Sequence, residues 1–217
     1  MKKVLILVEG QTEETFIKRI LAPYLADKNI HLIPTILVTK EVKDGANFKG
    51  GMTKYEIVRG DILRLLGDSS ASNVTTMFDY YGLRDDFPGF GSRTGDCYSK
   101  VKKIEDALLS DIDNDKFIPY IQLHEFEALL FSSPETITEV LGATTEQKAR
   151  VMKIKEEIDN PEEINERPDT CPSKRILDIF PEYTKVLYGS LISGAIGIEQ
   201  LKRECRHFNS WIEQLEA

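Results

Sequence analysis

The residues best suited to chemistry are four carboxylates, each of which closely follows a short apolar, strand-like run. They are Glu9 after residues 4–8, Asp79 after residues 74–78, and Glu125 and Glu127 after residues 117–124. In an open parallel sheet the carboxyl ends of the strands face one crevice, and such folds bind ligands there. We therefore expect these distant acids to converge on a single site.

An aspartate-rich loop begins at the second of these acids. Asp79, Asp85 and Asp86 lie within eight residues, and their oxygens are the hard ligands that Mg²⁺ or Mn²⁺ prefers. Asp is also common in loops because it caps turns, so a purely structural role stays open for Asp85 and Asp86. Glu9 could be a general base, a metal ligand or a partner in a salt bridge.

Glu125 and Glu127 stand where the last predicted strand runs into a short apolar helix. They share a side in an extended chain but diverge by roughly 200° on a helix. We therefore expect only one of them to contact a metal ion directly. His124 and Glu125 do not begin a zinc-protease motif, because that motif needs a histidine at the position of Ala128.

Two segments could bind an anion. Gly10 lets the chain turn tightly from a strand into a helix and exposes the N–H groups that follow, although no P-loop motif is present. Ser173 is the expected N-cap of a later helix, where Lys174 and Arg175 would complete an anion site. The alternative is a capped helix with two solvated cations. Weaker cationic candidates are Arg84, Arg93, Lys202, Arg203 and Arg206.

Up to about residue 131 the chain alternates strand and helix signals, the pattern of an α/β domain with a parallel sheet. Strands are predicted at residues 4–8, 30–39, 74–78 and 117–123, and helices from Thr12 onward, at 53–66 and at 97–109. Residues 43–51 are rich in glycine and lysine. They form either a mobile segment near the crevice or a solvated connector.

Beyond residue 131 the pattern changes to helices separated by proline-containing loops. Helices are predicted from Ser133 onward and at residues 145–158, 174–179 and 198–215. The expected fold class is α/β, with a parallel sheet of about four strands flanked by helices. Residues 1–131 would form this domain, and the mostly helical portion 132–217 would pack on it as one compact unit.

Composition narrows the class of protein. The 217 residues are 41% hydrophobic and 29% charged, typical of a globular protein with a substantial core, and no apolar run approaches the roughly 20 residues of a membrane span. The net charge of −8 argues against broad nonspecific binding of nucleic acid, but bound metal would let an acidic site receive a phosphodiester. Three cysteines without CxxC spacing, and no signal peptide, predict a reduced cytoplasmic protein.

Several longer motifs resemble those of the DUF4276 family of bacterial proteins. They are VEGQTEE, FDYYGLRDDFPG and LHEFEALLF after three predicted strands, and CPSKRI, PEYTKVLYG and IGIEQLKRECRHFNSWIEQL near the C-terminus. The resemblance covers nearly the whole chain. The N-terminal half of the family is similar to the Toprim fold of topoisomerases, primases and overcoming-lysogenization-defect-type nucleases.

The resemblance implies a Toprim-like sheet that holds Mg²⁺ or Mn²⁺ for phosphodiester chemistry. Toprim proteins place a glutamate after the first strand and a DxD motif after a later one. Glu9 and Asp79 match these positions, whereas Tyr81 replaces the second aspartate. The missing carboxylate would come from Asp85, Asp86, Glu125 or Glu127.

Three functions are compatible with such a site. The leading prediction is a divalent-metal-dependent nuclease or a related phosphodiester enzyme that acts on nucleic acid. The alternatives are a non-catalytic module that works with an ATPase partner in phage defence, and a hydrolase of small phosphates or nucleotides. The expected catalytic residues are Glu9, Asp79 and Glu125, the metal ligands Glu9, Asp79, Asp85 and Glu127, and the phosphate-binding residues Gly10, Ser173, Lys174 and Arg175.

Overall fold

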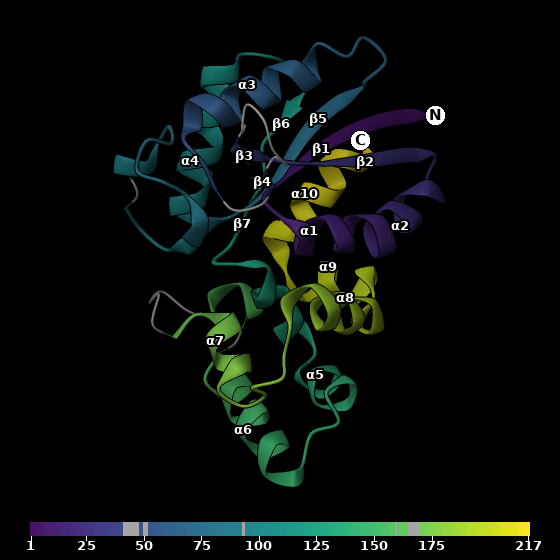
Figure 1. Cartoon of the computed structure of the whole chain (residues 1–217), viewed down its shortest axis with the longest axis vertical. Helices are drawn as coiled ribbons and strands as arrows, with labels where there is room; N and C mark the ends of the chain where they lie inside the picture. Colours follow the sequence, from purple (N-terminus) through teal and green to yellow (C-terminus); the bar gives the residue numbers. More distant parts are fainter. Residues whose placement is uncertain (41–47, 50–51, 93, 159, 165–169) are drawn as a thin grey trace.

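The computed structural model describes residues 1–40, 48–49, 52–92, 94–158, 160–164 and 170–217, and a parallel β-sheet lies at its centre (Figure 1). The strands follow the order β2-β1-β5-β6, and β7 also pairs with β5. Their bounds are β1 Lys2–Val8, β2 Ile30–Ile36, β5 Asn73–Asp79, β6 Phe117–Ile118 and β7 Ile121–Gln122. Every pairing in this sheet is parallel. The predicted α/β class with a parallel sheet is confirmed.

The strand predicted at residues 117–123 is interrupted and forms β6 and β7. Pro119 lies between them and has no N–H to give to a ladder, and Tyr120 donates its N–H to the Thr76 hydroxyl at 2.9 Å. β7 then resumes pairing with the last two residues of β5. The chain is thereby led to the carboxyl end of β5, beside Asp79.

Both faces of the sheet are covered, because side chains alternate along β1. Val4, Ile6 and Val8 belong to a hydrophobic cluster with α1 (Gln11–Phe16), η1 (Ile17–Leu21), α2 (Ala22–Ala26) and α10 (Arg206–Glu216). Leu5 and Leu7 belong to a second cluster with α3 (Tyr55–Leu66) and α4 (Cys97–Ile112). A strand that is apolar on both faces is typical of a buried parallel sheet.

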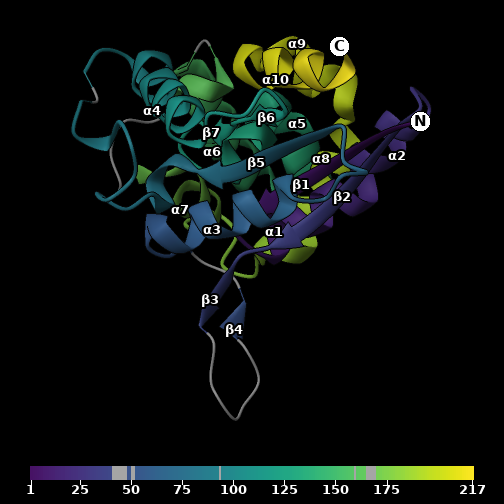
Figure 2. The ribbon, with the colours of Figure 1, turned by 90° about the horizontal axis from the view of Figure 1, so that it is seen from above.

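The strand predicted at residues 30–39 ends earlier, at Ile36. Residues Val38–Lys40 (β3) instead pair antiparallel with Phe48–Lys49 (β4) in a separate small sheet. Figure 2 shows these two strands extending away from the main sheet and its helices. Most of the predicted loop at 43–51 lies outside the described residues, and so does Arg93.

The chain after residue 131 is helical, as predicted. α5, α6 and α7 form the lower part of the molecule in Figure 1, and α8 to α10 return toward the sheet. No helix in the described ranges has the length and apolar character needed to cross a membrane. The remaining elements are η2 Tyr80–Gly82, η3 Phe90–Ser92, η4 Phe126–Ser132, α5 Pro134–Val140, α6 Thr145–Glu156, η5 Pro161–Glu163, α7 Pro172–Leu177, α8 Lys185–Ile196 and α9 Ile198–Glu204.

Two helix predictions need correction, and one helix is not among those predicted. That helix is α8, whose glycines and serines have low helix propensity. The helix predicted at 198–215 is divided into α9 and α10 by Cys205, whose backbone is extended. The N-cap of α7 is Cys171 and not Ser173, since Pro172 takes the first helical position, which suits a residue without an N–H.

Candidate functional site

Three parallel strands bring carboxylates to one edge of the sheet. Glu9 follows β1, Asp79 ends β5, and Glu125 lies beyond β7. The N–H of Asp79 donates to Glu9 Oε2 at 3.4 Å, and the N–H of Phe126 donates to Asp79 Oδ1 at 2.9 Å. The structure therefore places these acids together at the carboxyl ends of the strands.

The carboxylate of Glu9 rests against Gly82 in η2. A β-carbon at position 82 would lie 2.8 Å from Glu9 Oε2 and 3.0 Å from Oε1, too close for a real contact. Glycine is thus the residue that leaves space for this carboxylate. Burial raises the pKa of Glu9, and the N–H of Asp79 and the positive charge of Lys185 oppose the rise.

Glu13 is a further acid of this site, although its sequence position indicates only the first turn of a helix. Its Oε2 accepts the N–H of Gly10, the residue that precedes α1, at 2.9 Å, and the residue is 6% exposed. Burial, with the negative charge of Glu9, raises the pKa of Glu13 to about 7. Burial and the charges of Glu13 and Glu9 raise the pKa of Asp79 well above its usual value. The three acids therefore form one interacting group.

Lys185, the first residue of α8, supplies a positive charge to the site. Its Nζ lies 3.1 Å from Glu125 Oε2 and 3.1 Å from Glu127 Oε2. The Lys185 side chain is 44% exposed, whereas that of Glu127 is 1% exposed, so the ammonium covers a buried acid. Although burial opposes it, the charges of Glu127 and Glu125 raise the pKa of Lys185. We call Glu9, Glu13, Asp79, Glu125 and Glu127 the carboxylate cluster.

The position of Lys185 depends on how α8 packs. A β-carbon at Gly189 would lie 3.1 Å from Phe126 Cε1 and 3.4 Å from the Tyr183 hydroxyl, so glycine lets α8 approach η4 closely. Tyr183, just before α8, donates its hydroxyl to Glu127 Oε1 at 3.3 Å. The sequence does not predict that Lys185 and Tyr183 lie beside Glu127, because the helix predictions do not include α8.

The expected anion site at α7 is used within the protein. The N–H of Ser173 donates to Glu125 Oε1 at 2.6 Å. Although burial opposes it, Lys185 and Ser173 together lower the pKa of Glu125. Arg175 turns elsewhere, with its Nε donating to Thr170 O at 2.9 Å, and Lys174 is exposed. This helix terminus therefore orients an acid of the cluster.

Tyr81 and Asp85 are not members of the carboxylate cluster. Tyr81 donates its N–H to His124 O at 2.9 Å, and its hydroxyl lies 3.1 Å from His124 Nδ1. Asp85 is exposed on the loop after η2. In the described part of the chain it shares no hydrogen bond or ion pair with the cluster.

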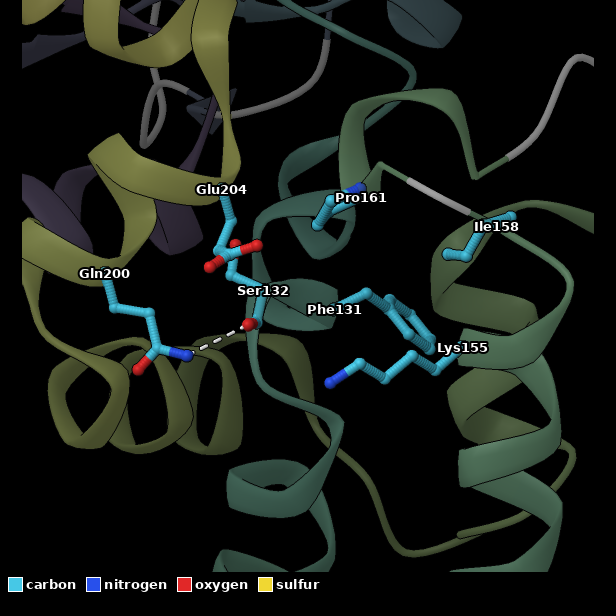
Figure 3. A pocket seen from close by; sticks show the side chains of 7 residues that line it. All are labelled: Phe131, Ser132, Lys155, Ile158, Pro161, Gln200 and Glu204. Carbon is cyan, nitrogen blue, oxygen red and sulfur yellow. Dashed lines mark hydrogen bonds between the residues drawn. The ribbon is translucent and has the colours of Figure 1, made fainter.

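A cavity of about 100 Å³ lies elsewhere, between η4, α6 and α9 (Figure 3). Gln200 Nε2 donates to Ser132 O at 3.0 Å in its wall. None of the carboxylate cluster lines it, so this cavity is separate from the candidate site. Its lining residues are Phe131, Ser132, Lys155, Ile158, Pro161, Gln200 and Glu204.

The charge of the cluster is suited to a further cation. Lys185 pairs with two of its carboxylates, and burial is the largest cause of the raised pKa of Glu9, Glu13, Asp79 and Glu127. Carboxylate oxygens are the ligands of Mg²⁺ and Mn²⁺. Among the described residues, no three acidic, histidine or cysteine side chains are already arranged around one point. The carboxylates fit a divalent ion in their charge and in the type of their oxygen ligands. Because they are not yet arranged around one point, their side chains would have to move to bind it.

The metal-free protein is expected to lose stability as the pH rises from about 4.5 to about 7. The pKa values of Glu13 and Glu127 rise from 4.5 to about 7 in the fold, so the folded chain holds more protons than the unfolded chain in this window. The stability that these bound protons contribute is fully present below about pH 4.5 and is lost as the pH rises past about 7. Melting temperatures in EDTA test the slope. Glu13→Gln should reduce it, and a melting temperature that rises across this window would contradict the prediction.

Comparisons with known proteins give one family and several structures. The family model described as "Domain of unknown function (DUF4276)" matches residues 8–216, and no curated protein matches. The C-terminal region of the Burkholderia pseudomallei OLD protein is similar at 14% identity, with 100% of both chains covered and a TM-score of 0.49. The C-terminal region of the Xanthomonas campestris pv. campestris OLD protein, phased with mercury, shows 13% identity, with 99% of this chain and 98% of that chain covered and a TM-score of 0.43.

Proposed function

The chain belongs to the DUF4276 family, and we propose that it is a divalent-metal-dependent enzyme that hydrolyses phosphodiesters, with nucleic acid as its substrate. The observation that carries this proposal is the carboxylate cluster. Acids from three strand ends, α1 and η4 meet there, and Lys185 pairs with two of them. Most of their pKa values are raised by burial, so a bound cation would relieve the repulsion between them.

Glu9, Glu13 and Asp79 are the residues proposed to hold Mg²⁺ or Mn²⁺. Tyr81 stands where a DxD motif would have its second aspartate, and Glu13 would supply the carboxylate that is missing there. Such an ion activates water and stabilises the leaving oxygen of a phosphodiester. The positive charge of Lys185 acts on both Glu9 and Asp79 and lowers their pKa values against the effect of burial.

Lys185 is proposed to position a phosphate at the mouth of the cluster. Its ammonium has three N–H groups, and two of them face Glu125 and Glu127. A phosphate oxygen is a suitable acceptor for the third. Glu125 is in turn held by Ser173, so the role of Glu125 and Glu127 would be to orient the lysine.

We expect Mn²⁺ to bind the wild-type protein and to support cleavage of at least one nucleic acid. Calorimetry with Mn²⁺ measures binding, and single-stranded DNA, duplex DNA and RNA are the substrates to be assayed. Glu13→Gln should remove both properties because it removes a proposed ligand. Glu14→Gln is the matched control, since Glu14 is the next residue but pairs with exposed Lys18. Binding that is equal in all three proteins would refute the metal assignment.

A second candidate is a non-catalytic module that acts with a partner, for which the family resemblance suggests an ATPase. The observation that favours it is Tyr81, which binds His124 and does not extend the cluster. A hydrolase of small phosphates would use the same acids. Assays in the presence of the partner distinguish the three functions. Cleavage of nucleic acid indicates the nuclease, release of phosphate from nucleotides indicates the hydrolase of small phosphates, and neither activity indicates the non-catalytic module.

A further inference from the structure

A groove of about 470 Å³ lies between α6 and α7, in the lower part of the molecule (Figure 1). Arg150, Lys153, Ile154 and Glu157 line it from α6 and the residue that follows this helix. Their spacing of three, four and seven residues places them on one face of α6. One wall of the groove is therefore a helix face that combines two cations, an acid and an apolar side chain.

Two arginines reach across the groove, one from each wall. The second wall consists of α7 and the residues after it, which contribute Arg175, Asp178 and Ile179. Arg150 Nη2 donates to Asp178 O at 3.1 Å, and Arg175 Nη1 lies 3.8 Å from Glu157 Oε2. These contacts hold both guanidinium groups at the groove. Because each guanidinium has five N–H donors, both retain donors for a ligand.

Cations outnumber acids along these two helices. α6 contains four lysine and arginine residues and two glutamates, and α7 contains two cations and no acid, whereas the whole chain has a net charge of −8. Glu157 and Asp178 directly follow the two helices, so the described lining of the groove holds three cations and two acids. Lys153 is exposed, and among the described residues it forms no hydrogen bond or ion pair. The charge of the groove therefore suits an anionic ligand.

α7 connects the groove to the carboxylate cluster. Ser173 in α7 donates its N–H to Glu125 of the cluster, and Arg175 of the groove is two residues further along the same helix. From Arg150 to Glu157 the wall is about 10 Å long at 1.5 Å per residue, which corresponds to about three nucleotides at 3.4 Å each. A strand with one phosphate at the cluster would therefore need only a few more nucleotides to occupy the groove.

We propose that the groove between α6 and α7 binds the phosphate backbone of a nucleic acid strand whose scissile phosphate lies at the carboxylate cluster. This proposal rests on the proposed function and narrows the substrate to polynucleotides, as opposed to small phosphates. The three cations pair with successive phosphates, and Ile154 and Ile179 contact the sugars. No aromatic side chain is among the described lining residues, so binding does not depend on the bases. An acidic protein segment has a similar charge, but the connection through Ser173 favours the substrate of the cluster.

The test measures fluorescence anisotropy of a labelled single-stranded DNA of roughly 12 nucleotides, with Ca²⁺ in place of Mn²⁺ and at several KCl concentrations. Lys153→Gln should weaken binding about two- to fivefold. It should also make the slope of log K against log[salt] shallower by about 0.7, the value for one phosphate contact to a single strand. Glu157→Gln should instead tighten binding about twofold, because it removes an acid beside Arg175. Lys148→Gln is the control, since Lys148 is an exposed lysine of α6 that does not line the groove, and it should leave affinity and slope unchanged.

Hydrolysis of bis(para-nitrophenyl) phosphate by the wild-type protein with Mn²⁺ tests the chemistry of the cluster separately, because this small diester does not need the groove. If the diester is cleaved but Lys153→Gln binds the strand as the wild type does, the groove proposal fails and the proposed chemistry stands. If Lys153→Gln and Glu157→Gln shift strand binding in opposite directions but neither diester nor strand is cleaved, the groove stands and the proposed nuclease fails. A strand that does not bind overturns the groove proposal. A polyglutamate peptide that binds more tightly than the strand also overturns it, in favour of an acidic protein partner.

Discussion

Asp79→Asn is expected to lower the rate of metal-dependent cleavage strongly and, at the same time, to raise the melting temperature of the metal-free protein. Asp79 lies between Glu9 and the start of η4, and burial and two neighbouring negative charges raise its pKa. Asn keeps an oxygen that accepts the N–H of Phe126 but removes the charge. The substitution therefore removes a repulsion that the apo protein carries and a ligand that the ion needs.

The two effects have different expected sizes. Loss of a metal contribution of several kcal/mol corresponds to a fall in kcat/KM on the order of 10²–10³-fold. Removal of one partly buried, repelled charge should add about 1 kcal/mol of stability, which raises the melting temperature by about 2–4 °C in a chain of this size. Such a combination of higher stability and lower activity is typical of functional acids.

Calorimetry, cleavage rates and thermal unfolding in EDTA together test this prediction. Asp106→Asn is the matched control, because Asp106 forms an exposed pair with Lys102 on α4, with 60% of its side chain accessible. The control should change neither activity nor melting temperature appreciably. If Asp79→Asn lowers the melting temperature, Asp79 has a structural role and the repulsion argument is wrong. If it leaves Mn²⁺ binding intact, the ion is held elsewhere.

Lys185→Met is expected to destabilise the metal-free protein by about 1–3 kcal/mol. Removing one partner of a buried ion pair costs about 3–5 kcal/mol because the remaining charge is left unpaired, and we lower this value since part of the lysine is in solvent. The remaining acids are Glu127, with a 1% exposed side chain, and Glu125 at 9%. Their mutual repulsion would no longer be offset.

Urea denaturation of the variant and of a double mutant isolates this effect. Glu127→Gln removes the acid that is left uncompensated, so adding it to Lys185→Met should restore most of the lost stability. Mn²⁺ should also restore part of it if the ion binds the folded cluster. Lys102→Met is the control, because its pair with Asp106 is exposed and should contribute under about 1 kcal/mol. A double mutant no more stable than Lys185→Met would show that the cost lies in the packing of α8.

The sequence predicts the part of the site that depends on strand direction. Glu9 and Asp79 each follow an apolar run, and the ends of parallel neighbours meet at one edge whatever the details of packing. Glu125 is predictable for the same reason. A local sequence pattern is sufficient here because a strand fixes the direction of the chain over several residues.

The sequence does not predict which charges complete the site. Glu13 has the pattern of an acid at a helix start, and only the fold shows that it is buried beside Glu9. Lys185 is 58 residues from Glu127 and begins a helix that its own residues do not indicate. Ser173 has the pattern of an N-cap for an outside anion, yet its N–H is used by Glu125. Each of these roles depends on which segment packs against the cluster.

What the sequence alone determined is therefore the α/β class, the helical C-terminal portion and the edge of the sheet at which the acids stand. These properties follow from hydrophobic periodicity, which is local. The tertiary structure alone decided the balance of charge at that edge: Glu13 joins the predicted acids there, Lys185 covers Glu127, and Asp85 stays outside. The physical reason is that the pKa of an acid depends on burial and on neighbours distant in sequence, which only the packing of η4, α7 and α8 against the strand ends brings together.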